Sequence, residues 1–399
     1  MNKVQLPFGM QDYLPDECYN KENAESKLCG VFSSYGYKRV GMPTLEYYDL
    51  FTADGAMSGN KLFKLTDTDG NLLALRADAT IQICRMYVTN MSGVQRMYYS
   101  LDAFEYLRDS NSARDREFAQ TGVELLGDSG IEGEVEMLTM AIDSLRAAGL
   151  ENFKLELGHV GYFEGLAEEF GLDPERIATL KALINKKDMI GVELFFRDSD
   201  ISEEHKAGML GLPSLFGNVG VLDKAEALCG NGKSREAIAR LRLLTERMDK
   251  IGLGGYVTID LGLVSCNNYY TGLVFKGICG DVGSSILDGG RYDRLCDRIG
   301  RSTPAIGFAI GVRRLLAALK ASGRWEKAPK ADIAYTVIDC DDGIVRKTLV
   351  SLRKKNRVVR VFGDEKALIA YCTEKGVSRA VIFDGDAVEL NLSGKGGAV

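Results

Sequence analysis

The stretch of sequence that decides the fold reads Glu117-Phe118-Ala119-Gln120-Thr121-Gly122-Val123-Glu124. It predicts a strand that continues through residues 118–126. Gln120 and Glu124 are four positions apart, so in a strand both side chains lie on the same face. A polar stretch at 108–116 separates this strand from the apolar run Met97-Tyr98-Tyr99. We therefore expect the two runs to form an antiparallel pair.

Strand and helix patterns continue on both sides of this pair. They predict helices at 15–37, 131–148 and 312–320, strands at 72–76, 153–158, 256–264, 271–278 and 305–310, and a glycine-rich stretch at 288–293. Ile81, Cys84 and Val88 recur at helical spacing, so we expect a helix start near Thr80, whose hydroxyl can cap it. Apolar residues at helical spacing also mark residues 162–250, which we interpret as a helical insertion used for packing.

The organisation predicts an α+β protein, an antiparallel sheet flanked by helices, followed by a second and smaller domain. A linker lies around residues 322–329, and strands alternate with helices over residues 333–391, which is typical of a small α/β domain. We expect a core at 1–325, with its insertion at about 162–250, and the small domain at 330–399. Seven basic residues of that domain are interpreted as a solvated face: Arg346, Lys347, Arg353, Lys354, Lys355, Arg357 and Arg360.

The composition argues against several classes of function. Nine cysteines occur without a Cys-x-x-Cys, which opposes a disulfide framework and a zinc site. Only His159 and His205 are available to a histidine-based metal site or catalytic triad, so we expect no metal. The net charge of −6 does not favour binding to a long polyanion such as tRNA. No apolar run approaches the roughly 20 residues of a membrane span, and no signal peptide is evident, so we expect a cytoplasmic protein.

Six motifs, in the same order along the chain, resemble those of histidyl-tRNA synthetases. They are Pro7-Phe8-Gly9-Met10-Gln11-Asp12-Tyr13-Leu14-Pro15, Leu75-Arg76-Ala77-Asp78-Ala79-Thr80 with Arg85, the strand at 117–124, Asn268-Tyr269-Tyr270-Thr271-Gly272-Leu273-Val274-Phe275, Gly289-Gly290-Arg291-Tyr292-Asp293, and the motif 3 strand and helix at 304–315. The resemblance covers residues 1–320 and implies the antiparallel sheet of a class II aminoacyl-tRNA-synthetase-like fold. The tail resembles, less specifically, a shortened anticodon-binding domain.

The resemblance implies a pocket for free histidine. The ammonium group of the amino acid needs acceptors, which Asp78, Thr80 and Gln120 can supply, although Asp78 is one methylene shorter than the glutamate of the family. The imidazole needs an acceptor for a ring N–H and aromatic walls. The full candidate set is Asp78, Thr80, Arg108, Gln120, Glu124, Tyr269, Tyr270 and Tyr292, with Arg108 or backbone N–H groups as candidates for the histidine carboxylate. Core packing is the alternative reading of the tyrosines.

The groups that would activate histidine with ATP are altered. Glu105 follows Phe104 where the family has an arginine, and Ser265 stands where it has a catalytic arginine. A carboxylate that faces a triphosphate is repulsive, and loss of one transition-state donor typically costs roughly 10²–10³ in rate. Three further departures from acidic residues of the family are Leu107, Asn268 and Arg313, whereas Arg314 is retained.

A retained amino-acid half beside an altered nucleotide half resembles the synthetase-like regulatory subunit of ATP phosphoribosyltransferase. In that family the subunit has no catalysis and no cofactor of its own. It assembles with a short-form catalytic subunit and conveys feedback inhibition by free histidine in the first step of histidine biosynthesis. The resemblance also implies a homodimer formed near residues 38–50 within a hetero-oligomer. Two alternatives stay open: a divergent histidyl-tRNA synthetase, and a histidine-binding paralogue with another partner.

Overall fold

The computed structural model describes residues 4–106, 116–185, 188–197, 209–264, 269–280 and 282–392. The chain divides into two compact units, Met1–Glu326 and Lys327–Val399. Each unit has hydrophobic clusters of its own, two in the first and two in the second. Within the described ranges, no helix is both long enough and apolar enough to cross a membrane.

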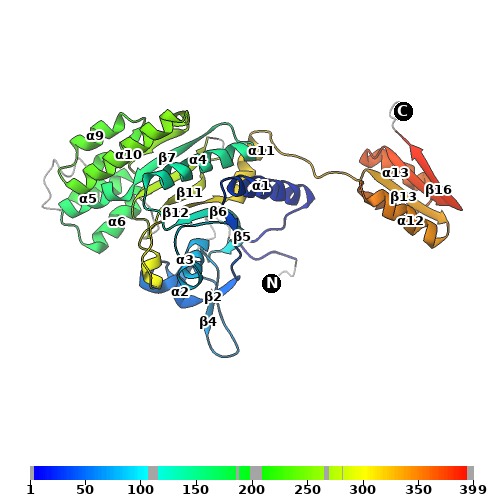
Figure 1. The fold of residues 1–399 in the computed structure, drawn as a ribbon, viewed down its shortest axis with the longest axis horizontal. Helices are drawn as coiled ribbons and strands as arrows, with labels where there is room; N and C mark the ends of the chain where they lie inside the picture. The colour runs from blue at the N-terminus through cyan, green and yellow to red at the C-terminus, as the bar shows by residue number, and fades with distance from the viewer. Residues whose placement is uncertain are drawn as a thin grey trace. The chain divides into compact units, whose positions relative to one another are not determined.

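A nine-stranded sheet runs through the first unit (Figure 1). Its strands, in spatial order, are β1 (Lys38–Arg39), β5 (Gln95–Phe104), β6 (Glu117–Leu126), β12 (Ala305–Gly311), β11 (Ser285–Arg291), β10 (Leu273–Cys279), β7 (Phe153–His159), β9 (Val257–Asp260) and β8 (Phe216–Gly217). The expected antiparallel pair is β5 and β6, with Met97 opposite Glu124 and Tyr99 opposite Gly122. Pairing is antiparallel from β5 through to β7, and the flanking helices complete the predicted fold class, which is confirmed.

The two faces of this sheet carry different side chains. Along β6, Ala119, Val123 and Leu125 belong to one cluster, whereas Leu126 belongs to the other, as the alternation of a strand requires. The first cluster packs under helices α1 (Pro15–Ser34), α4 (Ile131–Ala148) and α11 (Val312–Ala321). The second packs against α3 (Ala79–Asn90). Glu124 lies on the α3 side, because it is two positions from Leu126.

The helical insertion follows β7 and extends the first cluster. Its helices are α5 (Val160–Glu169), α6 (Pro174–Asn185), α7 (Met189–Arg197), α9 (Val221–Ala227) and α10 (Gly232–Lys250). His159 is the N-cap of α5, where its Nδ1 accepts a hydrogen bond from the Gly161 N–H at 3.1 Å. Burial lowers the pKa of His159 to about 4, so the ring is neutral and serves the helix.

A second, three-stranded sheet lies beside α3. Its order is β2 (Leu45–Tyr47), β4 (Leu72–Leu75) and β3 (Lys64–Thr66), and α2 (Tyr48–Thr52) follows β2 directly. Leu45 pairs with Leu75, and Tyr47 and Leu65 both pair with Leu73. All five side chains therefore share one face of this sheet, and Leu45, Tyr47 and Leu65 remain exposed on it.

Several local features differ from the sequence expectations or were not predicted. The glycine-rich stretch at 288–293 begins inside a central strand, β11, because its glycines give room to neighbouring side chains. The first helix ends at Ser34, short of Gly36, which has a φ of 81°. The cap of α3 is the carboxylate of Asp78, which accepts from the Thr80 N–H at 2.7 Å, and the Thr80 hydroxyl is engaged elsewhere. Short turns of 3-10 helix were not predicted: η1 (Ala53–Gly55), η2 (Gly59–Lys61), η3 (Leu212–Ser214), η4 (Gly254–Tyr256) and η5 (Cys296–Ile299).

The second unit is a small α/β structure. Its four-stranded sheet has the order β14 (Val358–Arg360), β13 (Ile333–Asp339), β15 (Arg379–Asp384) and β16 (Asp386–Asn391). Helices α12 (Asp342–Arg353) and α13 (Glu365–Lys375) contribute to separate clusters, so they cover opposite faces of the sheet. Leu349 of α12 is buried in one cluster and Leu368 of α13 in the other.

Candidate functional site

Five of the predicted site residues meet on the α3 side of the large sheet, and we call them the acid–tyrosine cluster: Asp78, Thr80, Glu124, Tyr269 and Tyr292. The Tyr292 hydroxyl donates to Glu124 Oε2 at 2.6 Å, and the Thr80 hydroxyl donates to Glu124 Oε1 at 2.9 Å. The Tyr269 hydroxyl donates to Asp78 Oδ2 at 3.0 Å. Both carboxylates are thus held by hydroxyl donors that come from distant parts of the chain.

The start of α3 positions two members of the cluster. Asp78 is in the extended conformation and caps the helix through its Oδ1, which leaves its Oδ2 for Tyr269. Thr80 lies two residues on, and its hydroxyl reaches across to β6. This explains why the hydroxyl does not cap the helix, since the Glu124 carboxyl group offers it a buried acceptor.

Glu124 is the most enclosed acid of the cluster, with 2% of its surface exposed. Burial raises the pKa of Glu124 to about 8, and the nearby Asp78 adds to the rise, while the two hydroxyl donors oppose it. Gly307 of the neighbouring strand makes room for this side chain, because a β-carbon there would overlap Glu124 Oε2. The carboxylate therefore has one well-defined place in the site.

Within the described residues, neither acid has a basic partner. Burial also raises the pKa of Asp78, against the effect of its bonds from Tyr269 and Thr80. Among the ion pairs of the described residues, none includes Asp78 or Glu124. Two enclosed carboxyl groups without a cation favour either bound protons or a cationic ligand. The arrangement is chemically suited to a small molecule that carries positive charge and N–H donors.

Aromatic rings form the walls of the cluster. The ring centroid of Tyr269 lies 5.0 Å from that of Tyr270 and 6.2 Å from that of Tyr292. Tyr270 is half-buried and lies over Gly290, where a β-carbon would come within 2.8 Å of its ring. The predicted tyrosines are thus brought together, and a glycine on an adjacent strand provides the space for Tyr270.

Tyr99 is a further residue of the site that the sequence analysis missed. It is 1% exposed, and its hydroxyl oxygen lies 2.5 Å from where a β-carbon of Gly122 would be. Burial, with the nearby Glu124 and Asp78, raises the pKa of its hydroxyl well above the usual value. One signal could have found it: in an antiparallel β5–β6 pair, Tyr99 must lie beside the glycine between Gln120 and Glu124.

Arg291, from the glycine-rich motif at 289–293, supports the site without entering it. It is buried, and its Nε donates to Glu134 Oε1 at 2.9 Å, where Arg240 Nε also donates to the other oxygen at 2.8 Å. Its Nη1 pairs with Asp293 at 3.0 Å, and Asp293 in turn accepts from the Ala305 N–H at 2.8 Å. These bonds fix the ends of β11 and β12, and so hold Tyr292, between Arg291 and Asp293, toward Glu124.

Of the remaining predicted site residues, Gln120 is described by the structure and Arg108 is not. Gln120 is half-buried on the Glu124 face of β6, between Leu101 of β5 and Gly311 of β12. The structure thus puts Gln120 in the same row of side chains as predicted, with no described contact to the cluster. The positions that lie outside the described residues are Leu107, Arg108, His205, Ser265, Asn268 and the loop at 108–115.

The neighbouring positions that the resemblance assigns to the nucleotide side carry paired charges. Glu105, at the end of β5, forms an ion pair with Lys61 at 3.1 Å. Arg314 of α11 pairs with Asp288 at 3.5 Å and donates to Ser285 Oγ at 3.1 Å. These two basic groups are therefore already engaged by acceptors of the chain itself.

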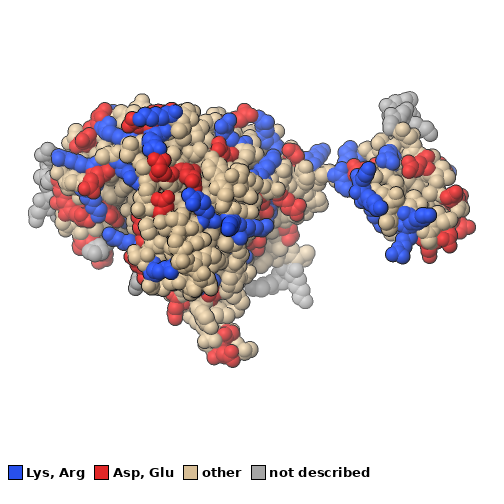
Figure 2. Space-filling model, in the orientation of Figure 1, with Lys and Arg blue, Asp and Glu red and all other residues tan. Residues whose placement is uncertain are grey.

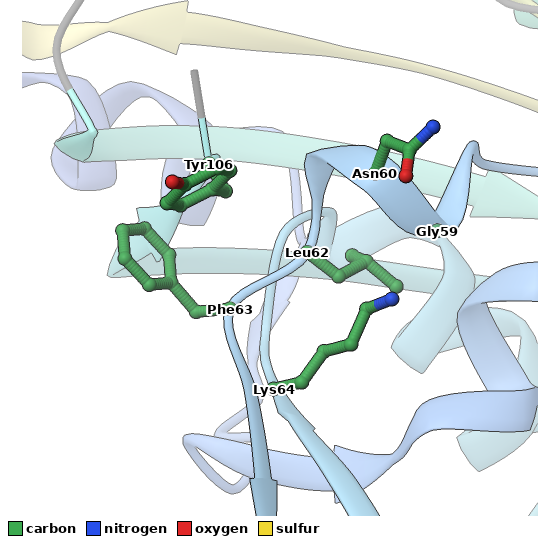
Figure 3. Close-up of a pocket in the computed structure, with 6 residues that line it drawn as sticks. All are labelled: Gly59, Asn60, Leu62, Phe63, Lys64 and Tyr106. Carbon is green, nitrogen blue, oxygen red and sulfur yellow. The ribbon is translucent and has the colours of Figure 1, made fainter. Parts of the chain in front are cut away.

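A separate hollow of about 300 Å³ lies between the segment at 59–64 and Tyr106 (Figure 3). It is lined by Gly59, Asn60, Leu62, Phe63, Lys64 and Tyr106. Phe63 and Tyr106 meet edge to face, with ring centroids 5.4 Å apart. The hollow shares no residue with the acid–tyrosine cluster and has no carboxylate in its lining, so it is not suited to the same ligand.

Comparisons with known proteins show the family of the chain. The sequence profile of a family described as histidyl-tRNA synthetase matches residues 9–315. The ATP phosphoribosyltransferase regulatory subunit of Acetivibrio thermocellus is 36% identical over 99% of this chain and 96% of that relative. The same-named protein of Ruminiclostridium cellulolyticum is 36% identical over 90% of this chain and 87% of that relative.

Solved structures give the same answer for the fold. A Bacillus halodurans protein described as an ATP phosphoribosyltransferase regulatory subunit/histidyl-tRNA synthetase superposes with a TM-score of 0.84 at 28% identity, over 96% of this chain and 99% of its own. A Nostoc histidyl-tRNA synthetase, at 19% identity, shares the fold with a TM-score of 0.78 over 98% and 97% of the two chains. With its site built on the histidyl-tRNA-synthetase framework, the chain belongs to the family of ATP phosphoribosyltransferase regulatory subunits.

Proposed function

We propose that this chain is the non-catalytic regulatory subunit of an ATP phosphoribosyltransferase, that it binds free histidine, and that it conveys feedback inhibition to a short-form catalytic subunit in the cytoplasm. The catalytic partner follows from the names of the relatives, which are regulatory subunits of this enzyme. Histidine as the effector is the finer part of the proposal and rests on the site.

The observation that carries the proposal is the acid–tyrosine cluster, whose two enclosed carboxyl groups form no ion pair with any basic residue that the structure describes. Histidine supplies what the cluster lacks, an ammonium group and a ring N–H. In the proposed complex, Asp78, the Thr80 hydroxyl and Gln120 receive the ammonium, and Glu124 accepts from the imidazole. Tyr269, Tyr270 and Tyr292 enclose the ring, and Arg108 remains the candidate for the histidine carboxylate.

The paired charges beside the cluster support a binding role without adenylation. Glu105 places a carboxylate where a triphosphate would need a cation. This carboxylate forms an ion pair with Lys61 at 3.1 Å. Arg314 is likewise held by Asp288 and Ser285. Freeing these cations for ATP would cost the existing pairs, and the remaining carboxylates would repel the phosphates.

The exposed face of the three-stranded sheet supports the proposed homodimer. Leu45 is 40% exposed, Tyr47 60% and Leu65 37%, and all three lie on the same face with Leu73 and Leu75. A contiguous apolar face of this kind marks an interaction site more often than a solvated surface. A second copy of the chain, related by a twofold axis, would cover it, near the expected residues 38–50.

The decisive experiment reconstitutes the chain with its catalytic subunit. ATP phosphoribosyltransferase activity is measured with and without this chain, over a range of histidine concentrations. We expect the chain to be required for full activity and histidine to reduce that activity. Calorimetry on the chain alone should show histidine binding, and coupling requires that histidine affinity changes when the catalytic subunit and its substrates are present.

Two results would contradict the proposal. Formation of histidyl-adenylate from histidine and ATP by the purified chain would make it a synthetase. Histidine binding without any effect on a catalytic subunit that the chain does bind would remove the feedback role and favour a histidine-binding paralogue with another partner.

A further inference from the structure

The helix α12 of the second unit presents an unusual surface, which we call the α12 patch: Val350 with Arg346, Lys347, Arg353 and Lys354. The four basic residues are all the neighbours of Val350 at three and four positions along the helix, so they surround it on the surface. Lys354 follows the last helical residue and keeps helical dihedral angles. Val350 is 54% exposed at the centre of this ring.

The charges of the patch have no counter-ions among the residues that the structure describes. From residue 343 to residue 363 the sequence has seven basic residues and no acidic one. In the described part of the chain, only Arg357 of these seven is in an ion pair, with Asp332. Figure 2 shows Lys and Arg side chains gathered over part of the second unit and Asp and Glu side chains over other parts of it.

A solvated helix face in the same chain looks different. Most basic residues of α10 form ion pairs: Lys233 with Glu164 and Glu168, Arg240 with Glu134, Arg242 with Asp223 and Glu226, Arg247 with Glu132, and Lys250 with Glu246. Favourable interaction with the helix dipole accounts for Arg353 and Lys354 at the C-terminal end of α12. It does not account for Arg346 and Lys347, which lie one turn inside the N-terminal end.

The fold does not need these side chains for packing. The face of α12 that covers the sheet is formed by Val345, Leu349 and Leu352, and Leu349 is 6% exposed. Val350 is about 100° around the helix from Leu349, on the side away from Val345 and Leu352, and all five residues of the patch are exposed. Four unpaired cations around an apolar centre therefore face outward.

We propose that the α12 patch is a docking surface for an acidic protein surface with an apolar centre, and that the catalytic subunit of ATP phosphoribosyltransferase supplies it. The partner rests on the proposed function. Protein interfaces combine an apolar centre with a charged rim, which is the composition of the patch. Carboxylates of the partner would meet the two pairs of cations, which are about 10 Å apart along the helix axis.

Charge and side-chain type favour a protein over a nucleic acid as the occupant. A phosphate backbone would leave Val350 without an apolar contact, and α12 has no aromatic side chain on which a base could stack. The net charge of −6 for the whole chain also opposes binding to a long polyanion. An acidic patch on a protein can also offer Val350 an apolar contact, and it is not a long polyanion.

The experiment uses the full chain and the purified catalytic subunit, with binding measured by surface plasmon resonance at several salt concentrations. The charge-reversed variants are R346E/K347E and R353E/K354E. We expect each to weaken binding by about 10-fold or more and to slow association, because rim charges act on the encounter rate. The matched control is K330E/K366E, which reverses two exposed cations of the same unit and should bind within about twofold of the unchanged chain.

The outcomes separate this inference from the proposed function. If the unchanged chain binds and both patch variants bind equally well, the docking surface is wrong and the regulatory role stands. If the unchanged chain does not bind, the proposed function fails, and this inference fails with it. Patch variants that lose affinity for RNA while they keep affinity for the catalytic subunit would also overturn it. Melting temperatures equal to that of the unchanged chain, expected for exposed positions, exclude misfolding as the cause of weak binding.

Discussion

The acid–tyrosine cluster differs from the neighbouring pairs of charged residues in what its carboxyl groups bind. In the cluster, Asp78 and Glu124 are held by hydroxyl donors and have no basic partner among the described ion pairs. Beside it, Glu105 and Asp288 have Lys61 and Arg314 as partners. The first region is electrostatically incomplete and can gain from a ligand, whereas the second has satisfied its charges internally.

Under the proposed function, this difference separates a half of the site that binds a ligand from a half that does not. An enclosed carboxyl group without a counter-ion is costly, so its retention suggests a cationic ligand that offsets the cost. Exposed or half-exposed ion pairs such as Glu105 with Lys61 contribute little to stability and keep phosphate away. The following predictions test that contrast.

The largest effect is expected from Gly307→Ala. The new β-carbon would overlap the Glu124 carboxylate and come within 2.5 Å of the Val123 carbonyl oxygen, so the strand or the acid must move. We expect histidine binding to be lost and the free energy of unfolding to fall by about 3 kcal/mol, as in overpacked cores. Calorimetry and denaturant titration measure the two effects.

Gly283→Ala is the matched control for that substitution. Gly283 lies in the connection between β10 and β11, and a β-carbon there meets nothing within 4 Å. Both histidine affinity and stability should stay close to those of the unchanged chain. Normal histidine binding by Gly307→Ala would show that the position of Glu124 is not needed, and the cluster would lose its assigned role.

The second prediction compares two glutamates directly. Glu124→Gln keeps the size of the side chain but removes the carboxylate that would ionise against bound histidine, and a hydrogen bond to a charged group contributes about 1.5–3 kcal/mol. We expect histidine affinity to fall by roughly 100-fold, which corresponds to about 2.7 kcal/mol. Glu105→Gln, the matched change in the paired region, should alter histidine affinity by less than about twofold, since Glu105 bonds to Lys61 and to no member of the cluster. If both variants lost the same amount of histidine affinity, the two regions would not differ in their role in binding.

The smallest predicted effect is a pH dependence of stability without ligand. The pKa of Glu124 is about 8 in the folded protein and near 4.3 in an unfolded chain, so the folded state binds more protons between these values. Its contribution to stability is fully present below about pH 4 and is lost as the pH rises through 8. Between pH 5 and pH 8, the free energy of unfolding should fall by more in the unchanged chain than in Glu124→Gln, by at least about 1.4 kcal/mol, the equivalent of one pKa unit.

Denaturant titrations of both proteins at pH 5, 6.5 and 8 test this prediction. The comparison with Glu124→Gln isolates Glu124, because Asp78, whose pKa is also raised, is present in both proteins. Parallel pH profiles for the two proteins would mean that Glu124 is ionised in the folded state, and the cluster would then be anionic before any ligand arrives.

Much of the fold could be predicted from local patterns. The helix at 131–148 and the strands at 97–99 and 118–126 were predicted because their periodicity is strong and lies within one segment. The central strand β11 was not predicted, because glycines weaken a strand pattern and acquire meaning only through their neighbours on β10 and β12. The short strands β2 and β3 have three residues each, too few for a period to show.

The sequence by itself determined the family, the class of fold and most of the candidate site, because ordered motifs and the two-residue period of β6 are local properties of the chain. Only the tertiary structure decided how those residues are used. In the structure, the Thr80 hydroxyl donates to Glu124, and the buried Arg291 donates to Glu134. Tyr99 lies over Gly122 and joins the site. These choices depend on the register between strands that are far apart in sequence, and a one-residue slip would send each side chain to the other face.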